Sequence, residues 1–164
     1  MSEPRADRPQ VPGYGIPRTT KGMLPWSWCV ERLEAAEIYW LATADAKGAP
    51  HLNPIWGAWV DCRWYVEGGP TRWQRNLQAN PQMAIHVEST DRDVVIVEGR
   101  AREQVAPAAE LAERILGGYA KYRKIYEADP ANWAKGGLWE LRPLKAFAWT
   151  TFPTDMTRHR FEDD

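Results

Sequence analysis

Runs of β-branched and aromatic residues, many of them alternating with polar ones, recur along the chain and are separated by turn residues. Such runs predict strands. The strands that we expect span residues 38–43, 50–60, 64–66, 83–87, 94–104, 138–142 and 145–151. Most connections between them are too short for parallel crossovers, so neighbouring strands should run antiparallel. The pattern therefore predicts a mostly β protein, an antiparallel barrel with peripheral helices.

Three segments carry the spacing of helices instead. After Pro25, apolar residues follow at i, i+4 and i+7, which predicts a short amphipathic helix. Thr71 and Gln74 form a capping box, which opens a second helix over residues 72–80. A single long helix is expected over residues 107–128, because one apolar stripe runs along it. The stripe consists of Leu111, Ile115, Tyr119, Tyr122 and Tyr126.

The two ends of the chain differ from this central part. Residues 1–22 hold prolines and scattered charges but no apolar period, which predicts an arm that is either disordered or draped over the body. We expect residues 23–164 to form one domain. From Phe152 the tail is basic and aromatic until its acidic last residues. This tail either frays, as termini often do, or docks against its own subunit or a partner's cleft.

Composition narrows the range of functions. A chain of 164 residues is long enough for one domain with a core of its own. With a net charge of −1 and a pI near 6.3, it has no general attraction to nucleic acid or to an anionic membrane. No stretch approaches the roughly 18 apolar residues of a membrane span. Two cysteines far apart fit a reducing compartment, so we expect a cytoplasmic protein.

Tryptophan is the one unusual component, with ten residues in a chain of this size. Ten indoles do not all fit in the core of a small domain. Some should line a cleft or a subunit interface, where aromatic residues are enriched. The excess therefore predicts either a cleft or a subunit interface that is lined by aromatic residues.

Metal and hydrolytic chemistry find little support in the sequence. His51, His86 and His159 show no metal-ligand spacing, and Cys29 and Cys62 stand alone. No serine lies in a G-x-S-x-G elbow. We therefore expect no metal site.

The strongest chemical feature is the glycine-rich turn at residues 68–70, which runs into the helix that Thr71 caps. A helix N-terminus presents free N–H groups and a positive dipole end to an anion. Arg72 and Arg75 lie one turn apart and can converge on that anion, and Thr71 adds a hydroxyl. The segment predicts a phosphate site, although an ordinary capped helix with solvated arginines fits the same residues.

A second feature is the interrupted strand at residues 53–59. Pro54 removes a ladder donor, and Gly57 is typical of a bulge or a close backbone approach. The backbone groups left over can face a planar heterocycle, with Trp56 or Trp59 nearby. The alternative is a bulged strand whose tryptophans belong to the core.

Together these motifs resemble the pyridoxamine 5′-phosphate oxidase-like superfamily, the flavin and deazaflavin split barrels. The matching elements, in order, are L-A-T with a D-x-x-G turn, P-H-L-N-P-I-W, R-x-x-R-N-L-x-x-N-P, V-x-V-E-G and the tail A-W-T-T-F-P-T-D-M-T-R-H-R-F. The resemblance runs from about Leu24 to Phe161. It implies a homodimeric antiparallel split β-barrel, with two cofactors in clefts at the dimer interface.

The resemblance also implies which residues bind the cofactor, FMN or the deazaflavin F420. The phosphate is expected on the segment formed by Thr71, Arg72, Arg75 and Asn76. The isoalloxazine edge is expected along the strand formed by Asn53, Pro54, Ile55 and Trp56. Many members carry a lysine where this chain has Trp73, which is expected to stack on the ring or to shape the cleft. Arg158, in the tail, is expected near the polar side of the cofactor.

Two functions of different classes follow from the resemblance. The first is an oxidoreductase that transfers a hydride or electrons between FMN or F420 and a small-molecule substrate. The second is a non-catalytic carrier or storage protein for a flavin, a deazaflavin or a tetrapyrrole. A structural dimer with an empty cleft is a third alternative. Oxidation of vitamin B6 is not expected, because the substrate-phosphate residues of the true pyridoxamine oxidases are not found here.

Overall fold

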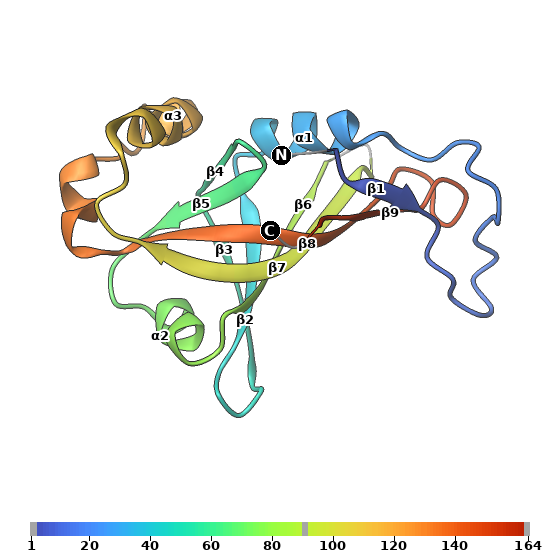
Figure 1. Ribbon diagram of the computed structural model, residues 1–164, viewed down its shortest axis with the longest axis horizontal. Coiled ribbons are helices and arrows are strands. Elements are labelled where there is room, and N and C mark those ends of the chain that lie inside the picture. The colour runs from blue at the N-terminus through green and yellow to red at the C-terminus, as the bar shows by residue number, and fades with distance from the viewer. Residues whose placement is uncertain (1–2, 90–91, 163–164) are drawn as a thin grey trace.

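The computed structural model describes residues 3–89 and 92–162 of the chain (Figure 1). These ranges contain the helices α1 (Trp26–Ala35), α2 (Arg72–Ala79) and α3 (Ala109–Tyr119), and the 3-10 helices η1 (Ala120–Tyr122) and η2 (Pro130–Lys135). Their strands are β1 (Arg5–Asp7), β2 (Tyr39–Ala44), β3 (Pro50–Ile55), β4 (Ala58–Val60), β5 (Arg63–Glu67), β6 (Gln82–Glu88), β7 (Val94–Gln104), β8 (Leu138–Trp149) and β9 (Thr157–Arg160). No helix within them is long and apolar enough to cross a bilayer.

The strands form one antiparallel sheet that curls into a split barrel. The main order is β1-β9-β8-β7-β6-β2-β3, and β5 pairs with both β8 and β4. Every pair is antiparallel. In the described part of the chain, no pairing joins β3 to β4 or β5, so the barrel is open between them. The predicted antiparallel split barrel is confirmed, and its opening lies beside the interrupted strand.

The interruption of the 50–60 segment follows from where its two halves lie. Pro54 is in β3, which among the described strands pairs with β2 alone, and such an edge strand tolerates a residue without an N–H. The chain then leaves the strand at residues 56–57 and continues as β4. Gly57 lies against the indole of Trp64, which would overlap a Cβ at this position. The glycine therefore marks a close approach, as predicted.

The expectation of two strands at residues 138–142 and 145–151 is wrong, because β8 is continuous across Pro143. The register with the neighbouring β7 shifts here, because Glu98 pairs with Lys145 and Gly99 with Pro143, so that Leu144 of β8 is the extra residue of a bulge. A Cβ on Gly99 would overlap the carbonyl oxygen of Arg142. Because a bulge interrupts the hydrogen-bond ladder locally, the proline, which has no N–H to donate, does not end the strand.

The predicted helix over residues 107–128 is also shorter than expected. α3 ends at Tyr119, and the chain continues as the 3-10 helix η1. Gly117 and Gly118 lie just before that end, and each glycine disfavours a helix by about 1 kcal/mol relative to alanine. The apolar stripe is nevertheless correct in part, because Ile115, Tyr119 and Tyr122 are buried.

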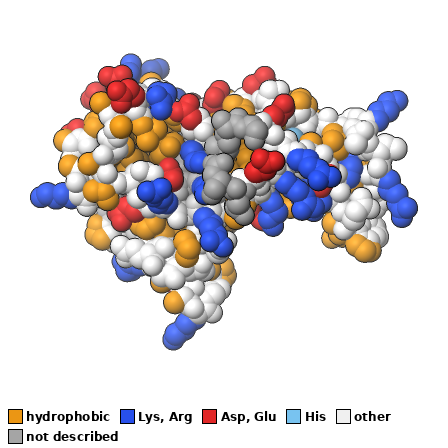
Figure 2. Space-filling model, viewed as in Figure 1, with side chains coloured by type: hydrophobic (Ala, Val, Ile, Leu, Met, Phe, Trp, Pro, Cys, Tyr) orange, Lys and Arg blue, Asp and Glu red, His pale blue; other side chains and the backbone are white. Residues whose placement is uncertain are grey.

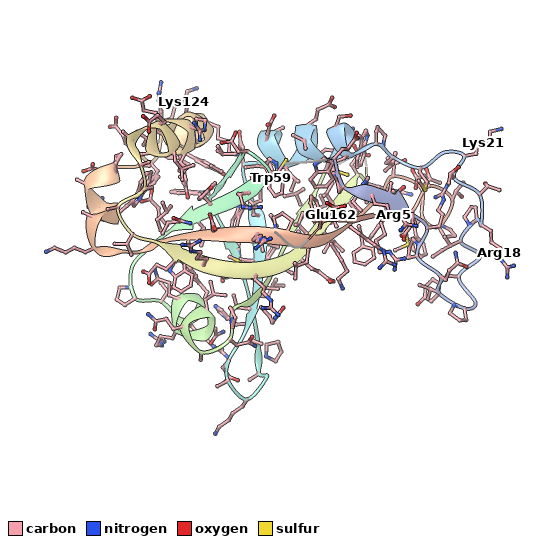
Figure 3. The ribbon with its side chains drawn as sticks, viewed as in Figure 1. Arg5, Arg18, Lys21, Trp59, Lys124 and Glu162 are labelled. Carbon is pink, nitrogen blue, oxygen red and sulfur yellow. The ribbon has the colours of Figure 1, made fainter. Side chains whose placement is uncertain are left out.

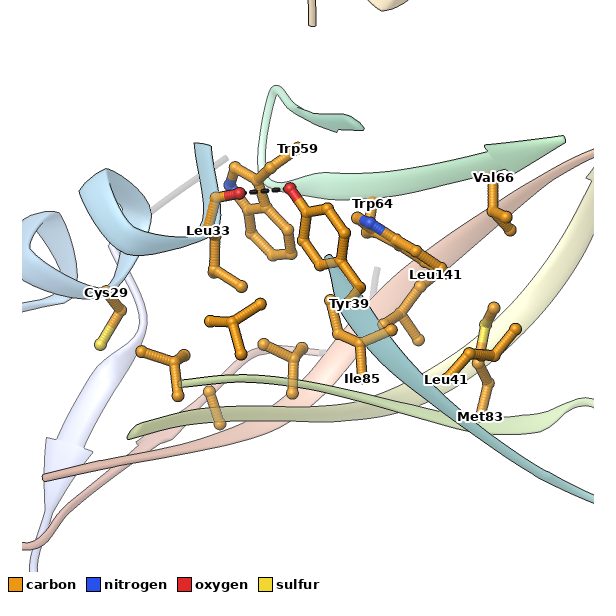
Figure 4. Close-up of a cluster of buried hydrophobic side chains, with 14 of the residues drawn as sticks. Cys29, Leu33, Tyr39, Leu41, Trp59, Trp64, Val66, Met83, Ile85 and Leu141 are labelled. Carbon is orange, nitrogen blue, oxygen red and sulfur yellow. Dashed lines mark hydrogen bonds between the residues drawn. The ribbon is translucent and has the colours of Figure 1, made fainter. Parts of the chain in front are cut away.

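The core consists of two clusters. The first fills the barrel beneath α1, where the hydroxyl of Tyr39 donates a hydrogen bond to the carbonyl of Leu33 (Figure 4). The second lies beneath α3, and Figure 2 shows hydrophobic side chains gathered next to this helix. Six of the ten tryptophans are buried in these clusters, and the other four are not. The buried six are Trp26, Trp59, Trp64, Trp73, Trp133 and Trp139.

The arm and the tail pair with each other at the end of the molecule away from α3 (Figure 1). We call residues 3–24 and 149–162 together the arm–tail lobe. Within it β9 lies between β1 and β8, and Thr157 and His159 are buried. Arg18 and Lys21 project from its outer loop (Figure 3). The arm is therefore draped over the body, and the tail docks on its own chain instead of fraying.

Candidate cofactor site

A cavity of about 440 Å³ lies in the opening of the barrel. One wall is the end of β3 and the following loop, where Pro54, Ile55 and Trp56 line it. The opposite wall comes from the end of β5 and from the segment around η1, which supplies Tyr119 and Tyr126. The lining is mainly apolar and aromatic, which suits a flat ring system.

Two further cavities of about 300 Å³ each adjoin the first one, and all three share Gly68. The middle cavity also shares Glu67 and Tyr126 with the first. The outer cavity reaches Arg75 of α2 and Lys135 of η2. We call the three cavities together the split groove. It brings the two segments singled out in the sequence, residues 53–59 and 68–76, to one place.

The start of α2 has the geometry that the capping box predicts. The Thr71 N–H donates to Oε1 of Gln74 at 3.3 Å, and Nε2 of Gln74 donates to the Gly68 carbonyl at 2.7 Å. These bonds fix the glycine-rich turn against the helix. The N-terminal end of α2, with its positive dipole end, therefore lies beside the outer cavity, which Gln74 and Arg75 line.

Two cationic side chains line that outer cavity. Arg75 is exposed, and its Nη1 donates to the Pro70 carbonyl at 3.3 Å, which engages one of five guanidinium donors. Lys135 is also exposed and lines the same cavity from η2. Arg72 lies on the same turn as Arg75 and is exposed, but it lies outside the walls of the three cavities.

The turn after Lys135 requires glycine. Gly136 and Gly137 have φ angles of 98° and 87°, in the region that side chains disfavour. Oε1 of Glu103 accepts a hydrogen bond from the Gly137 N–H at 2.8 Å and holds this turn. Glu103 also lines the outer cavity, so the cations there face one carboxylate.

Two residues expected at the cofactor are instead part of the core. Trp73 is only 4% exposed and packs inside the barrel, so its ring is not available for stacking on a ligand. Asn76 is likewise 4% exposed, and its Nδ2 donates to Oγ1 of Thr43 at 2.9 Å. Both point inward because the inner face of α2 packs on β2. Both side chains thus help to position α2 and lie outside the walls of the three cavities, and Trp73 shapes the groove from behind Gly68.

The aromatic end of the groove is supported from behind. The ring of Trp56 stacks on Tyr122 with centroids 5.6 Å apart and planes 25° apart. The Tyr122 hydroxyl donates to the Gly57 carbonyl at 3.1 Å. Nζ of Lys121 donates to the Tyr39 hydroxyl at 3.0 Å, and burial lowers the pKa of this lysine to about 8. These contacts hold η1 against the barrel and fix the wall behind Trp56.

Asn53, on β3 beside this end, carries an acceptor without a partner. Its Nδ2 donates to the Pro54 carbonyl at 3.2 Å. Its Oδ1 is buried and accepts no hydrogen bond from any described residue. A buried acceptor of this kind costs free energy unless a ligand or water donates to it.

Arg158 lies far from these residues within one chain. It is on β9 in the arm–tail lobe, whereas α2 is at the other end of the barrel (Figure 1). Its guanidinium donates to both carboxylate oxygens of Asp7, at 2.6 and 3.0 Å. Burial raises the pKa of Asp7, but the ion pairs with Arg158 and Arg160 outweigh this effect and lower it below its usual value. The chain itself thus supplies the anion that this arginine binds.

Sequence reasoning missed two charged residues of the groove, Glu67 and Lys135. Oε1 of Glu67 accepts a hydrogen bond from the Tyr126 hydroxyl at 2.8 Å, and Oε2 accepts one from the indole N–H of Trp133. Each of the two residues directly precedes a Gly-Gly pair, which was the available signal. Their convergence depends on the fold of residues 119–137, which no local pattern predicts.

A separate apolar surface covers the outer face of β2, β3 and β6. A cavity of about 370 Å³ lies there, lined among others by Trp40, Leu52 and His86. Trp40 is 38% and Leu52 61% exposed. Nε2 of His86 is buried without a hydrogen-bond partner among the described residues.

The residues of the split groove fit a phosphate-bearing flavin or deazaflavin. Arg75, Lys135 and the start of α2 offer donors and positive charge for a phosphate at one end. Trp56 and the edge of β3 offer a flat apolar wall at the other end. In the described ranges no group of three or more His, Cys, Asp or Glu residues is placed to hold a metal ion.

The fold thus is a split barrel whose opening contains a groove with a cationic end and a flat aromatic end. A family model described as pyridoxamine 5′-phosphate oxidase matches residues 28–150. The chain belongs to this family. No curated protein matches it.

Solved structures share the fold at low sequence identity. A FAD-binding protein from Mesorhizobium loti is 20% identical, with a TM-score of 0.62 over 85% of this chain and 96% of that one. An F420 reductase is 22% identical, with a TM-score of 0.54 over 74% of this chain and 95% of that one. The heme storage protein HutZ from Vibrio cholerae is 19% identical, with a TM-score of 0.56 over 71% and 88%. At these identities the likenesses show the fold alone.

Proposed function

We propose that the split groove binds FMN or a deazaflavin of the F420 type, and that the protein is an oxidoreductase acting on a small molecule. The observation that carries this proposal is the groove itself, which joins a cationic end to a flat aromatic end. Family membership and the names of two neighbours, a FAD-binding protein and an F420 reductase, support it. When bound, the ring supplies the hydride or electron transfer.

The chain's own residues bind and orient the cofactor. Arg75, assisted by the N–H groups of α2, holds the phosphate, and Thr71 and Arg72 lie on the same turn. Lys135 takes the place of the lysine that many relatives carry where this chain has Trp73. Each charge-assisted hydrogen bond to phosphate is worth about 1.5–3 kcal/mol.

At the other end, the chain positions the ring and limits its contact with water. Pro54, Ile55 and Trp56 lie along the ring edge, and Asn53 precedes them on β3. Tyr122 backs the indole of Trp56, which keeps this wall rigid. A rigid wall holds the reactive face of the ring at a fixed distance from a substrate.

We also propose that the protein is a homodimer whose contact is the outer face of β2, β3 and β6. The exposed Trp40 and Leu52 give this face an apolar surface that a second copy would cover. Stable homodimers bury more than about 2,000 Å² in total. Light scattering at micromolar concentration should therefore give twice the chain mass, and a monomer mass would contradict the dimer.

A second candidate is a carrier of a tetrapyrrole. The observation that favours it is the free Nε2 of His86 in an apolar cavity, because imidazole nitrogen is a common ligand of heme iron. The name of one neighbour, a heme storage protein, agrees with it. In that case His86→Ala should abolish hemin binding and leave FMN and F420 binding unchanged.

The test is identification of the ligand and of turnover. The visible spectrum of the purified protein, with mass identification of what denaturation releases, should show FMN or F420. The loaded protein should then oxidise its reduced cofactor when an enone or a quinone is added. Binding without turnover of any acceptor would favour the carrier, and a colourless protein that binds none of these ligands would overturn both candidates.

A further inference from the structure

Glu67 is the last residue of β5 and lies at the centre of the split groove. It lines both the ring-sized cavity and the middle one. Each cavity is lined by eight described residues, and in both Glu67 is the one that carries a charged side chain. A lone charge among apolar walls has a large influence on any ligand, because the surroundings screen it weakly.

The carboxylate of Glu67 is held in place by two donors. The Tyr126 hydroxyl binds one oxygen at 2.8 Å, and the Trp133 indole N–H binds the other. A carboxylate offers about four acceptor positions, so these donors occupy about half of them. The side chain is half-buried and borders both cavities, so the remaining positions are open to a ligand in the groove.

Tyr126 keeps this arrangement stable near neutral pH. Burial, together with its hydrogen bond to Glu67 and the charge of that residue, raises the pKa of Tyr126 above its usual value. The phenol therefore stays protonated and donates. The acceptor is preorganised before a ligand enters, which lowers the entropy lost on binding.

The place of Glu67 along the groove determines which part of a ligand it meets. Gly68 follows it directly and lines all three cavities, and Arg75 lies beyond that turn. A ligand with its phosphate at Arg75 and its ring at Trp56 would lie with one edge of the ring against Glu67, which lines the ring-sized cavity. In a flavin or deazaflavin the pyrimidine edge carries an N–H that suits a carboxylate acceptor.

This inference rests on the proposed function. We propose that Glu67 is a specificity-determining residue: it accepts a hydrogen bond from the pyrimidine N–H of the bound ring and disfavours the negative charge that the ring gains on reduction. A carboxylate held beside the ring would raise the free energy of a negatively charged reduced ring and so would lower the reduction potential of the bound cofactor.

The competing explanation is that Glu67 only anchors Tyr126 and Trp133. The two roles respond differently to Glu67→Gln and to Tyr126→Phe. The first variant removes the charge while keeping the size of the side chain. The second removes one anchoring bond and keeps the charge, which makes it the matched control.

The first experiment measures the potential of the bound ring, FMN or F420, whichever the wild type takes up. In Glu67→Gln the equilibrium ratio of reduced to oxidised ring should be about tenfold higher than in the wild type. For a two-electron couple this is a rise of about 30 mV in the reduction potential. Tyr126→Phe should leave the potential at or below the wild-type value. An unchanged potential in Glu67→Gln, or an equal rise in both variants, would overturn the inference.

The second experiment needs no variant and compares the same ring with its N3-methyl derivative. The wild type should bind the methylated ring about 10- to 150-fold more weakly, since a hydrogen bond to a charged group is lost. Equal affinities would overturn the role of Glu67 and leave the proposed function standing. A wild type that binds neither FMN nor F420 would overturn the proposed function, and this inference with it.

Discussion

The split groove and the arm–tail lobe each contain an arginine that the sequence places at a cofactor, and the two arginines differ in what they already bind. Arg158 in the lobe donates to both oxygens of Asp7 from within the same chain. Arg75 in the groove is exposed and donates to a single backbone carbonyl. A cation beside a cavity that binds no anion of its own chain is available for an anionic ligand, whereas one that is already ion-paired stabilises the fold.

The largest expected effect comes from deleting residues 152–164, which removes β9. This strand lies between β1 and β8, and the tail also accepts hydrogen bonds from Leu24 at Thr157 and from Arg8 at Met156. With hydrogen bonds worth about 1 kcal/mol each, the deletion should lower the free energy of unfolding by at least about 3 kcal/mol. Urea denaturation measures this loss. A truncated protein with wild-type stability would contradict the structural role of the tail.

A smaller effect is expected from Arg158→Ala, which leaves Asp7 with Arg160 alone. The free energy of unfolding should fall by about 1 kcal/mol, because the pair is only partly buried and solvent screens it. Arg160→Ala, at the more exposed pair, is the matched control and should cost less. Both variants should keep wild-type affinity for FMN or F420. A tenfold loss of affinity in Arg158→Ala alone would show that Arg158 takes part in cofactor binding.

The last effect is the pH dependence that His159 gives to the lobe, which is small at neutral pH and grows as the pH falls. Burial lowers the pKa of this histidine to about 4, although the charge of Asp7 opposes the shift. Between its ordinary value near 6.5 and about 4, the unfolded chain binds a proton that the folded chain does not. The free energy of unfolding should therefore fall as the pH drops through this range. His159→Gln should flatten the slope, and denaturation curves with equal slopes in both proteins would contradict it.

The fold followed from the sequence wherever local chemistry determines it. Alternating strands, the capping box at Thr71 and the turn before β3 depend on neighbours in the chain. The continuity of β8 across Pro143 depends on its pairing with β7 around a bulge at Leu144, which no local signal predicts. Gly117 and Gly118 indicate an early end of α3, but the apolar stripe continues beyond them and predicts a longer helix.

The site was predictable only as two segments. The spacing of Arg72 and Arg75 and the break at Pro54 identified the right stretches, because those features are local. Which side chains turn inward was not predictable, so Trp73 and Asn76 were assigned to the ligand although they pack in the core. Glu67 and Lys135 were missed, since their place in the groove is set by residues distant in the chain.

The most direct test of the central claim is a calorimetric titration of Arg75→Ala with a phosphorylated and a dephosphorylated ligand. If the cationic end of the groove holds a phosphate, the variant should bind FMN about 10- to 150-fold more weakly than the wild type. Riboflavin, which lacks the phosphate, should bind both proteins equally and more weakly than FMN binds the wild type. If the wild type prefers the deazaflavin, F420 and its chromophore without the phosphate replace FMN and riboflavin in this titration. A variant whose affinity for the phosphorylated ligand stays within twofold of the wild type would show that Arg75 is an ordinary solvated residue, contrary to the role argued for the split groove.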